Sequence, residues 1–344
     1  MRFRLLFFLL MYCAISQSQP TQPADYGLQA FIIHNNSLGT IRFYVSSKDI
    51  GKKKPVLLAL DGSGQYPMAL FVQLRKGSFV ANSFDQGLLE LADKFHVVMI
   101  SKPGINFCDT INIDKDSASV ADAVALLPPS QEYAQRAGLQ WRIAAASKVL
   151  DYVYSHFPVN KSKVVAYGYS EGAQVVPGLS VANKKITHCA CIAGSGLNQF
   201  YDFITAVRMK AAQGAISPQE AQQQVDSLFA QFAAIYAAPY DTQREWEGHS
   251  YQRWASFCSD IPMNNLTKLN IPIFMTAGTN DVSSPIYGLE YVKLEFLRLG
   301  KKNLTFRVYP TDHSFQEMKR VNGKDTVISH KQEMTADMMK WLKM

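Results

Sequence analysis

Six short segments of the chain are almost continuously apolar and rich in β-branched residues, and polar or turn-forming stretches separate them. This pattern is typical of strands that lie in a parallel sheet and are covered on both faces. The segments are PVLLAL (55–60), FHVVMIS (95–101), KVVAYGY (163–169), HCACIAG (188–194), IPIFMTAG (271–278) and LTFRVYP (304–310). Two earlier segments, LQAFIIHN (28–35) and GTIRFYVS (39–46), predict an opening hairpin.

Helical patterns lie between these predicted strands. The clearest covers 135–157 and contains WRIAAASKVLDYVYSHF, and another lies around 330–343. Strands that alternate with helices predict an α/β fold of the doubly wound kind. We therefore expect a mostly parallel central sheet with helices on both faces.

One segment departs from this alternation. From about 198 to 260 there is no strand pattern, but a helical stretch, SPQEAQQQVDSLFAQFAAIYAAPY. Its place between two sheet segments predicts a helical cap over the carboxyl edge of the sheet, where α/β folds bind ligands. An ordinary pair of packing helices is the alternative. Aromatic residues that could line a pocket under a cap, or pack in its core, are Phe200, Tyr201, Tyr236, Trp246, Tyr251 and Trp254.

Length and composition are sufficient for one large domain, expected over 17–344, because 47% of the 344 residues are hydrophobic. The chain begins MRFRLLFFLLMYCAISQSQ, in which Arg2 and Arg4 precede an apolar run from Leu5 to Met11 and a small-x-small sequence, Ala14-Ile15-Ser16. This order predicts a removable signal peptide over 1–16, since the run is too short to span a bilayer. We expect a secreted or periplasmic protein without stable membrane insertion after signal removal.

The formal net charge is +7, and +5 without Arg2 and Arg4. The basic residues are scattered, and no nucleic-acid-binding motif is present, so we expect no nucleic-acid partner. Four cysteines follow the signal. Cys189 and Cys191 stand two apart in a predicted strand and are expected to pack as small apolar residues. Cys108 and Cys258 lie in loop-like stretches and could form a disulfide, and they lack zinc-site spacing.

Residues 168–172, Gly-Tyr-Ser-Glu-Gly, match the pattern G-x-S-x-G between a predicted strand and a helix-competent run. In this context the serine lies on a strained turn above the sheet, and the glycines relieve crowding on both sides. The sequence therefore predicts Ser170 as a nucleophile. A serine hydroxyl needs a base, and that base needs a carboxylate to orient it.

The two partners should follow late strands, in the order acid and then histidine. Asp281 lies three residues beyond the predicted strand at 271–278, and His313 follows the one at 304–310. We predict the triad Ser170, Asp281 and His313. Asp312 is the competing acid, but as the immediate neighbour of the histidine it is expected to be structural.

Acyl transfer also needs backbone donors for a developing oxyanion. The residue after the nucleophile, Glu171, should supply one N–H, and its side chain is expected to fix the turn by hydrogen bonding. The glycine-rich loop LLALDGSGQYP should supply the other, from Ser63 or from Gly62 or Gly64 nearby. This loop lacks the Lys-Ser/Thr ending of a phosphate-binding loop. Gly62, Gly64, Tyr169 and Trp254 are predicted as substrate-binding residues.

Several motifs together resemble the α/β-hydrolase family over roughly 27–343. GYSEGAQVVPGL resembles the GHSEGG…P elbow of an esterase-like branch, and DGSGQ is similar to its oxyanion loop. GTNDVSSP and YPTDHSF resemble the acid and histidine loops, and ISKPGINFC takes the place of a D-x-x-G-x-G turn. The sequence departs from this branch at Asp61 (often His), Ala173 (Gly) and Lys102 (usually acidic). The resemblance implies a serine hydrolase that forms an acyl-enzyme and needs no metal or organic cofactor.

Hydrolysis of a small-molecule carboxylic ester is the predicted function. A serine peptidase or amidase is the close alternative, because the elbow does not select the leaving group. A binding protein that retains the fold without catalysis is a third possibility, but it would be expected to lack a triad member. The cap segment is only modestly apolar, which argues against a lipase.

Overall fold

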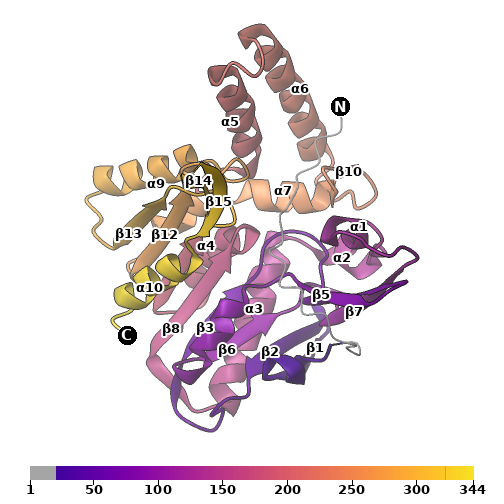
Figure 1. Ribbon diagram of the computed structural model, residues 1–344. Helices are drawn as coiled ribbons and strands as arrows, with labels where there is room; N and C mark the ends of the chain where they lie inside the picture. The colour runs from indigo at the N-terminus through magenta and orange to yellow at the C-terminus, as the bar shows by residue number, and fades with distance from the viewer. Residues whose placement is uncertain (1–20, 322) are drawn as a thin grey trace.

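The computed structural model describes residues 21–321 and 323–344, and its centre is an eight-stranded sheet (Figure 1). The sheet order is β1-β2-β6-β3-β8-β9-β12-β13. The first two junctions are antiparallel and the other five are parallel. The strands are β1 Leu28–Asn35, β2 Gly39–Ser46, β3 Lys54–Leu60, β6 His96–Ile100, β8 Val159–Tyr169, β9 His188–Ile192, β12 Ile273–Gly278 and β13 Leu304–Tyr309. All eight predicted strands are present in this sheet.

Alternate side chains of the central strands enter two separate cores. In β3, Val56 and Leu58 pack into one core, whereas Leu57 and Ala59 pack into the other. The first core is covered by α3 (Leu139–His156), α4 (Glu171–Ala182) and α9 (Ile286–Arg298), the second by η2 (Gln86–Asp93) and α10 (Lys331–Trp341). Burial on both faces explains why these strands are continuously apolar. The predicted fold class, a mostly parallel sheet with helices on both faces, is confirmed.

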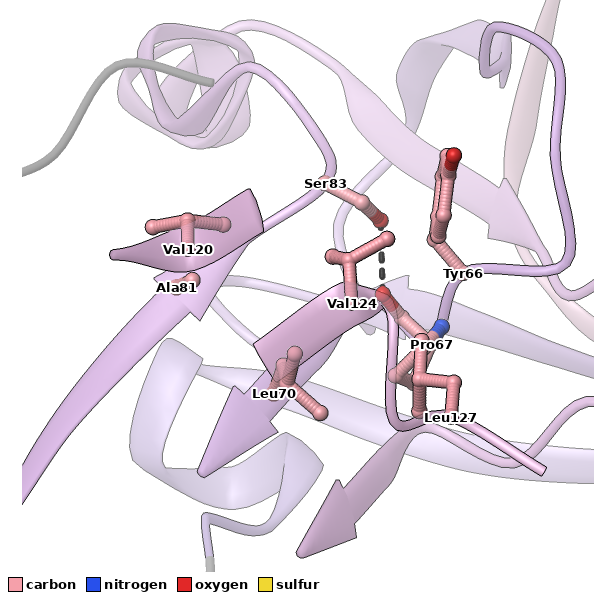
Figure 2. A pocket seen from close by; sticks show the side chains of 8 residues that line it. All are labelled: Tyr66, Pro67, Leu70, Ala81, Ser83, Val120, Val124 and Leu127. Carbon is pink, nitrogen blue, oxygen red and sulfur yellow. Dashed lines mark hydrogen bonds between the residues drawn. The ribbon is translucent and has the colours of Figure 1, made fainter. Parts of the chain in front are cut away.

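A second, three-stranded sheet lies beside the first and was not predicted. It has the order β5-β4-β7, with β4 at Ala69–Leu74, β5 at Ser78–Asn82 and β7 at Cys108–Ile113. Helix α1 (Val120–Val124) packs on it, and α2 (Gln131–Arg136) follows. A small apolar cavity of about 10 Å³ lies where this sheet meets α1, and its lining includes Tyr66, Pro67, Leu70, Val124 and Leu127 (Figure 2). Ser83 closes one side by donating a hydrogen bond to the Pro67 carbonyl.

The cap segment, residues 198–260, contains α5 (Gln199–Ala212), α6 (Pro218–Ala237) and α7 (Tyr251–Ser259). A capping box between Ser217 and Glu220, with Pro218 at the first position, starts α6. Two two-residue strands, β10 (Glu245–Trp246) and β11 (His249–Ser250), precede α7, where no strand was expected. In Figure 1, α5 and α6 form a hairpin that extends away from the sheet, whereas α7 lies close to it.

Other connections complete the fold. Helix α8 (Pro262–Leu266) leads from the cap segment toward β12, and η1 (Pro23–Tyr26) precedes β1. An antiparallel hairpin of β14 (Gln316–Val321) and β15 (Lys324–Ser329) joins the loop after β13 to α10. Among residues 21–321 and 323–344, no helix combines the length and apolar composition needed to cross a bilayer. The predicted signal peptide lies outside the described residues.

The four cysteines after the signal are unbridged. Cys189 and Cys191 are buried on β9 with their sulfur atoms 3.8 Å apart, and they pack as small side chains in the first core. Cys108 accepts a hydrogen bond from Thr21 at the start of β7, whereas Cys258 is buried in the core of the cap segment. The possible Cys108–Cys258 disulfide is therefore absent, because the two residues belong to different structural layers.

Candidate active site

Ser170 occupies a sharp turn between β8 and α4. Its backbone angles, φ 54° and ψ −116°, are rare for a residue with a side chain. The flanking glycines allow this turn, because the backbone around them leaves no room. A Cβ at Gly168 would lie 2.1 Å from the Gly172 carbonyl oxygen, and one at Gly172 would lie 2.2 Å from the Leu60 carbonyl oxygen. The turn thus holds a strained serine at the carboxyl end of the sheet.

Two late loops bring the other predicted residues to this serine. His313 Nε2 lies 3.0 Å from Ser170 Oγ, and His313 Nδ1 lies 2.8 Å from Asp281 Oδ2. The other oxygen of Asp281 accepts hydrogen bonds from the N–H groups of Ser283 and Ser284, each at 2.8 Å. Asp281 is buried, and the hydrogen bonds of its own loop hold it with one oxygen directed at the imidazole. The structure brings Ser170, His313 and Asp281 together in one hydrogen-bonded chain.

Asp312, the competing acid, has a different role in the structure. Its Oδ1 accepts hydrogen bonds from the N–H groups of Ser314 and Gln316, at 2.8 and 2.9 Å. These bonds shape the histidine loop. Tyr169, at the end of β8, also stabilises this loop, because its hydroxyl donates a hydrogen bond to the His313 carbonyl oxygen at 2.6 Å. The residue before the nucleophile thus fixes the backbone of the residue that would serve as its base.

The glycine-rich loop after β3 lies directly against the serine. A Cβ placed on Gly62 would be 3.4 Å from Ser170 Cβ and 3.8 Å from Oγ. Gly64 has φ +93°, and a side chain there would meet the ring of Tyr66. The loop backbone and the start of α4 therefore flank the same oxygen. A helix N-terminus also carries partial positive charge, which favours a developing anion.

A network of five charged side chains lies under the serine turn. Arg142 of α3 donates to Glu171 Oε1 and to Asp61 Oδ1, both at 2.6 Å. Lys102 contacts the other oxygen of Asp61 at 2.7 Å, and Arg253 of α7 contacts Glu171 Oε2 through two nitrogens. Burial alone would raise the pKa of Glu171, but Arg253, Arg142 and Lys102 lower it to about 2. Glu171 is thus a buried carboxylate that ties the serine turn to α3 and α7.

Sequence reasoning did not identify Arg142 or Arg253. Arg142 lies on the apolar face of α3, among Leu139, Ala145 and Ala146. A charge on an apolar helix face signals a buried partner, and this signal was present in WRIAAA. Asp61 and Lys102 are two of the positions at which the sequence differs from the esterase-like branch. The structure explains both differences, because the two side chains form an ion pair with each other. Sequence offered no sign that Arg253 would reach Glu171, 82 positions away.

A cavity of about 140 Å³ opens beside the imidazole, and we call it the His313 cavity. Gly62, Ser63, Tyr169 and His313 are among its lining residues. No residue of the cap segment lines it. The predicted contribution of the cap segment to the pocket is therefore not seen at this cavity.

Trp254, predicted to bind substrate, packs instead within the core of the cap segment. It contacts Phe200 and Trp246, and its Nε1 donates to the Trp246 carbonyl oxygen. Tyr251 belongs to the same core, whereas Tyr201 and Tyr236 are exposed. Gly64, also predicted to bind substrate, is not among the residues that line the cavity, but its lack of a side chain leaves room for the ring of Tyr66, which does line it. In the described ranges, no group of three or more His, Cys, Asp or Glu side chains is arranged to hold a metal ion.

No protein-family model matches the chain, and no curated protein matches it. Solved structures resemble it at 10–12% sequence identity. An acylaminoacyl peptidase of Pyrococcus horikoshii matches with a TM-score of 0.54 and 11% identity, over 92% of this chain and 41% of its own. An acylaminoacyl peptidase bound to Z-Gly-Gly-Phe-chloromethyl ketone gives 0.52 and 12% over the same shares. A dipeptidyl peptidase 4 of Porphyromonas gingivalis gives 0.50 and 10%, over 92% and 35%. This chain spans about two fifths of those chains or less.

Proposed function

We propose that this chain, which has the α/β-hydrolase fold, is a serine hydrolase that cleaves carboxylic esters through an acyl-enzyme. The observation that carries the proposal is the hydrogen-bonded series from Ser170 Oγ through His313 to Asp281, with distances of 3.0 and 2.8 Å. Such a series on a strained turn is the arrangement that activates a serine hydroxyl. Sequence resemblance and site geometry support the same three residues.

In the proposed reaction, Ser170 Oγ attacks the carbonyl carbon while His313 Nε2 accepts the hydroxyl proton. Asp281 accepts a hydrogen bond from Nδ1–H, holds the required tautomer and stabilises the imidazolium. His313 then protonates the leaving alcohol. Water, deprotonated by His313, attacks the acyl-enzyme and releases the acid, which regenerates Ser170.

The proposed oxyanion donors are the N–H groups of Glu171 and Ser63. Glu171 is the first residue of α4, and Ser63 follows Gly62, which lies against Ser170. Loss of one such donor typically raises the barrier by about 3 kcal/mol. Because Arg142 contacts both Glu171 and Asp61, it fixes the two donor segments relative to each other.

A peptidase or amidase reaction is the second candidate. The solved structures that resemble this chain are named as acylaminoacyl peptidase and dipeptidyl peptidase 4, and the same triad would serve an amide. Their low identity leaves the substrate of this chain open to experiment. The leaving group, an alcohol or an amine, distinguishes the two candidates.

Hydrolysis of a chain-length series of p-nitrophenyl esters, measured beside aminoacyl p-nitroanilides, tests the proposal. Ester turnover that is lost in Ser170→Ala would support the esterase, and anilide cleavage lost in that variant would support the peptidase. Absence of both activities, together with failure of a fluorophosphonate to label Ser170, would contradict the proposal and favour a binding protein.

We also propose export of the mature chain, on the basis of the order of charged, apolar and small residues in 1–16. Expression of the full chain in a secreting host, followed by N-terminal sequencing of the product, tests this. A mature N-terminus near residue 17 in the medium or periplasm is expected, whereas an intact N-terminus in the cytoplasm would contradict it.

A further inference from the structure

The His313 cavity is close enough to the reacting serine to hold part of a substrate. Its lining includes His313, which contacts Ser170, and Gly62, which lies against it. The end of β5, Asn82, and the segment 83–85 that connects it to η2 form another part of the lining. A group bound here would remain connected to a carbonyl at Ser170 through a short chain of atoms. The chemistry of the lining should therefore select the substrate.

Tyr167 gives the first indication of that chemistry. Its side chain on β8 is 1% exposed and lines the cavity, and its hydroxyl has no hydrogen-bond partner among the described residues. A buried polar group without a partner costs about 1–3 kcal/mol. A hydroxyl that is left unpaired at a cavity wall is suited to bind a polar group of a ligand.

Asp85 supplies a negative charge at the same cavity. Its Oδ1 caps η2 by accepting from Gly87 N–H at 3.0 Å, and none of the residues 21–321 and 323–344 donates a hydrogen bond to Oδ2. Burial raises the pKa of Tyr167 and of Tyr169, and the charge of Asp85 raises both further. Asp85, Tyr167 and Tyr169 all line this cavity, so a group bound there is bordered by the carboxylate and by both rings.

The remaining lining combines apolar walls with few other charges. Met68, Phe84, Leu88 and Met99 are apolar, and Lys102 forms an ion pair at 2.7 Å with Asp61, which also accepts a hydrogen bond from Arg142. Lys331, the first residue of α10, is the other lysine of the lining, and it forms no ion pair with any described carboxylate. A small cavity with apolar walls and a carboxylate suits a short alkyl chain that ends in a hydrogen-bond donor.

We propose that the His313 cavity binds an amino group carried by the substrate, with the Asp85 carboxylate as its counter-charge and the Tyr167 hydroxyl as a neutral hydrogen-bond partner. This inference rests on the proposed function, because it names the substrate class of the same site. It assigns Asp85 and Tyr167 as specificity-determining residues. The preferred esters are those whose acyl or alcohol part bears a primary amine on a short alkyl chain.

Pairs of esters that differ only in the terminal group test the proposal. p-Nitrophenyl 3-aminopropanoate is compared with the butanoate, and p-nitrophenyl 6-aminohexanoate with the heptanoate, so that an ammonium replaces a methyl group. We expect kcat/KM to favour one or both amino esters by about tenfold or more, the value of a charge-assisted hydrogen bond. Asp85→Asn should remove this preference and leave the alkyl esters within about twofold. Tyr167→Phe should reduce it by several fold.

Each substitution is chosen to leave the fold intact, so that a change in substrate preference reports on the cavity. Asparagine caps helices as well as aspartate does, so Asp85→Asn should retain the Gly87 contact and η2. Lys331→Met removes the unpaired lysine from the lining and should increase the amine preference. An unchanged preference in Asp85→Asn, or faster turnover of the alkyl esters by the unmodified protein, would overturn the proposal while ester hydrolysis itself stands.

A binding measurement separates this inference from catalysis. Calorimetric titration of the unmodified protein with pentylamine, at neutral pH where it is pentylammonium, should show binding that 1-pentanol does not reproduce and that Asp85→Asn abolishes. Equal binding of both compounds would overturn the inference. If no ester is hydrolysed and Ser170 is not labelled, the proposed function fails, and amine binding alone would then show what the cavity recognises.

Discussion

Arg142 Nη1 lies 2.6 Å from Oε1 of Glu171, the residue that follows the nucleophile in the chain. The other terminal nitrogen of the same guanidinium contacts the side chain and the carbonyl oxygen of Asp61, at the start of the glycine-rich loop. One planar group thus connects the two backbone segments that would stabilise an oxyanion. An arginine suits this task because its donors point in fixed directions, unlike those of lysine.

Replacement of Arg142 by methionine should therefore impair both stability and turnover. Glu171 would keep Arg253 and Asp61 would keep Lys102, but each would lose a buried partner, and we expect unfolding free energy to fall by about 3–5 kcal/mol. The kcat for ester hydrolysis should fall about 100-fold with little change in KM, because the donor segments would no longer be fixed. Denaturant unfolding and steady-state kinetics measure the two effects.

Two matched variants distinguish positioning from stability alone. Arg142→Lys keeps the charge but cannot hold both carboxylates, so kcat should still fall. Arg298→Lys alters an exposed pair with Glu295 and should change stability by less than about 1 kcal/mol and leave kcat unchanged. Normal kcat in Arg142→Lys would refute the positioning role.

Glu171 should make the protein sensitive to acid. Its pKa is lowered from 4.5 to about 2 by the surrounding cations despite its burial, so its contribution to stability is complete above pH 4.5. That contribution is lost as pH falls from about 4.5 to 2, and over the whole range it amounts to up to about 3 kcal/mol. In Glu171→Gln, the unfolding free energy should be lower at pH 6 and should decline less steeply between pH 6 and pH 3.5. Parallel pH dependences for the two proteins would contradict this account.

Tyr169→Phe should affect the reaction more than the fold. The lost hydroxyl donates to the backbone carbonyl of His313, so we expect kcat to fall by about tenfold and stability by about 1 kcal/mol. Tyr236→Phe provides the control, because that hydroxyl also donates to a backbone carbonyl, of Cys258, within the cap segment. The control should show a similar loss of stability with normal kcat. Equal kcat in the two variants would argue against a role for Tyr169 in holding the histidine loop.

Local pattern was sufficient to predict the central sheet, because its inner strands β3, β6, β9 and β12 are almost continuously apolar and buried, and the flanking strands carry β-rich segments bounded by turns. The small sheet was missed since β4 and β7 are parallel partners from either side of β6, and only the folded chain brings Ala69 opposite Cys108. The placement of Ser170, Asp281 and His313 follows from strand ends, which local sequence marks. By contrast, Arg142 and Arg253 are recognisable only through contacts with Glu171. The pattern of aromatic residues could not show whether Trp254 faces a cavity or its neighbours.

Close backbone packing at the serine turn yields a last prediction, for two glycines of the same helix. A Cβ at Gly172 would lie 2.2 Å from the Leu60 carbonyl oxygen, which is backbone and cannot move aside, whereas a Cβ at Gly178 would lie 2.7 Å from the Ile143 Cδ1 methyl, which can rotate away. Alanine also favours a helix over glycine by about 1 kcal/mol. Gly178→Ala should therefore leave stability within about 1 kcal/mol of the original.

Gly172→Ala should instead push α4 away from β3 and displace the Glu171 N–H from the nucleophile. We expect a loss of several kcal/mol, beyond the usual range for single substitutions, and slow labelling of Ser170 by a fluorophosphonate in whatever protein folds. Urea unfolding and the rate of Ser170 labelling, measured for both variants, test these two expected effects. If Gly172→Ala is as stable and as reactive as Gly178→Ala, then contact between α4 and β3 does not fix the serine turn, and the charged network around Glu171 would be its main support.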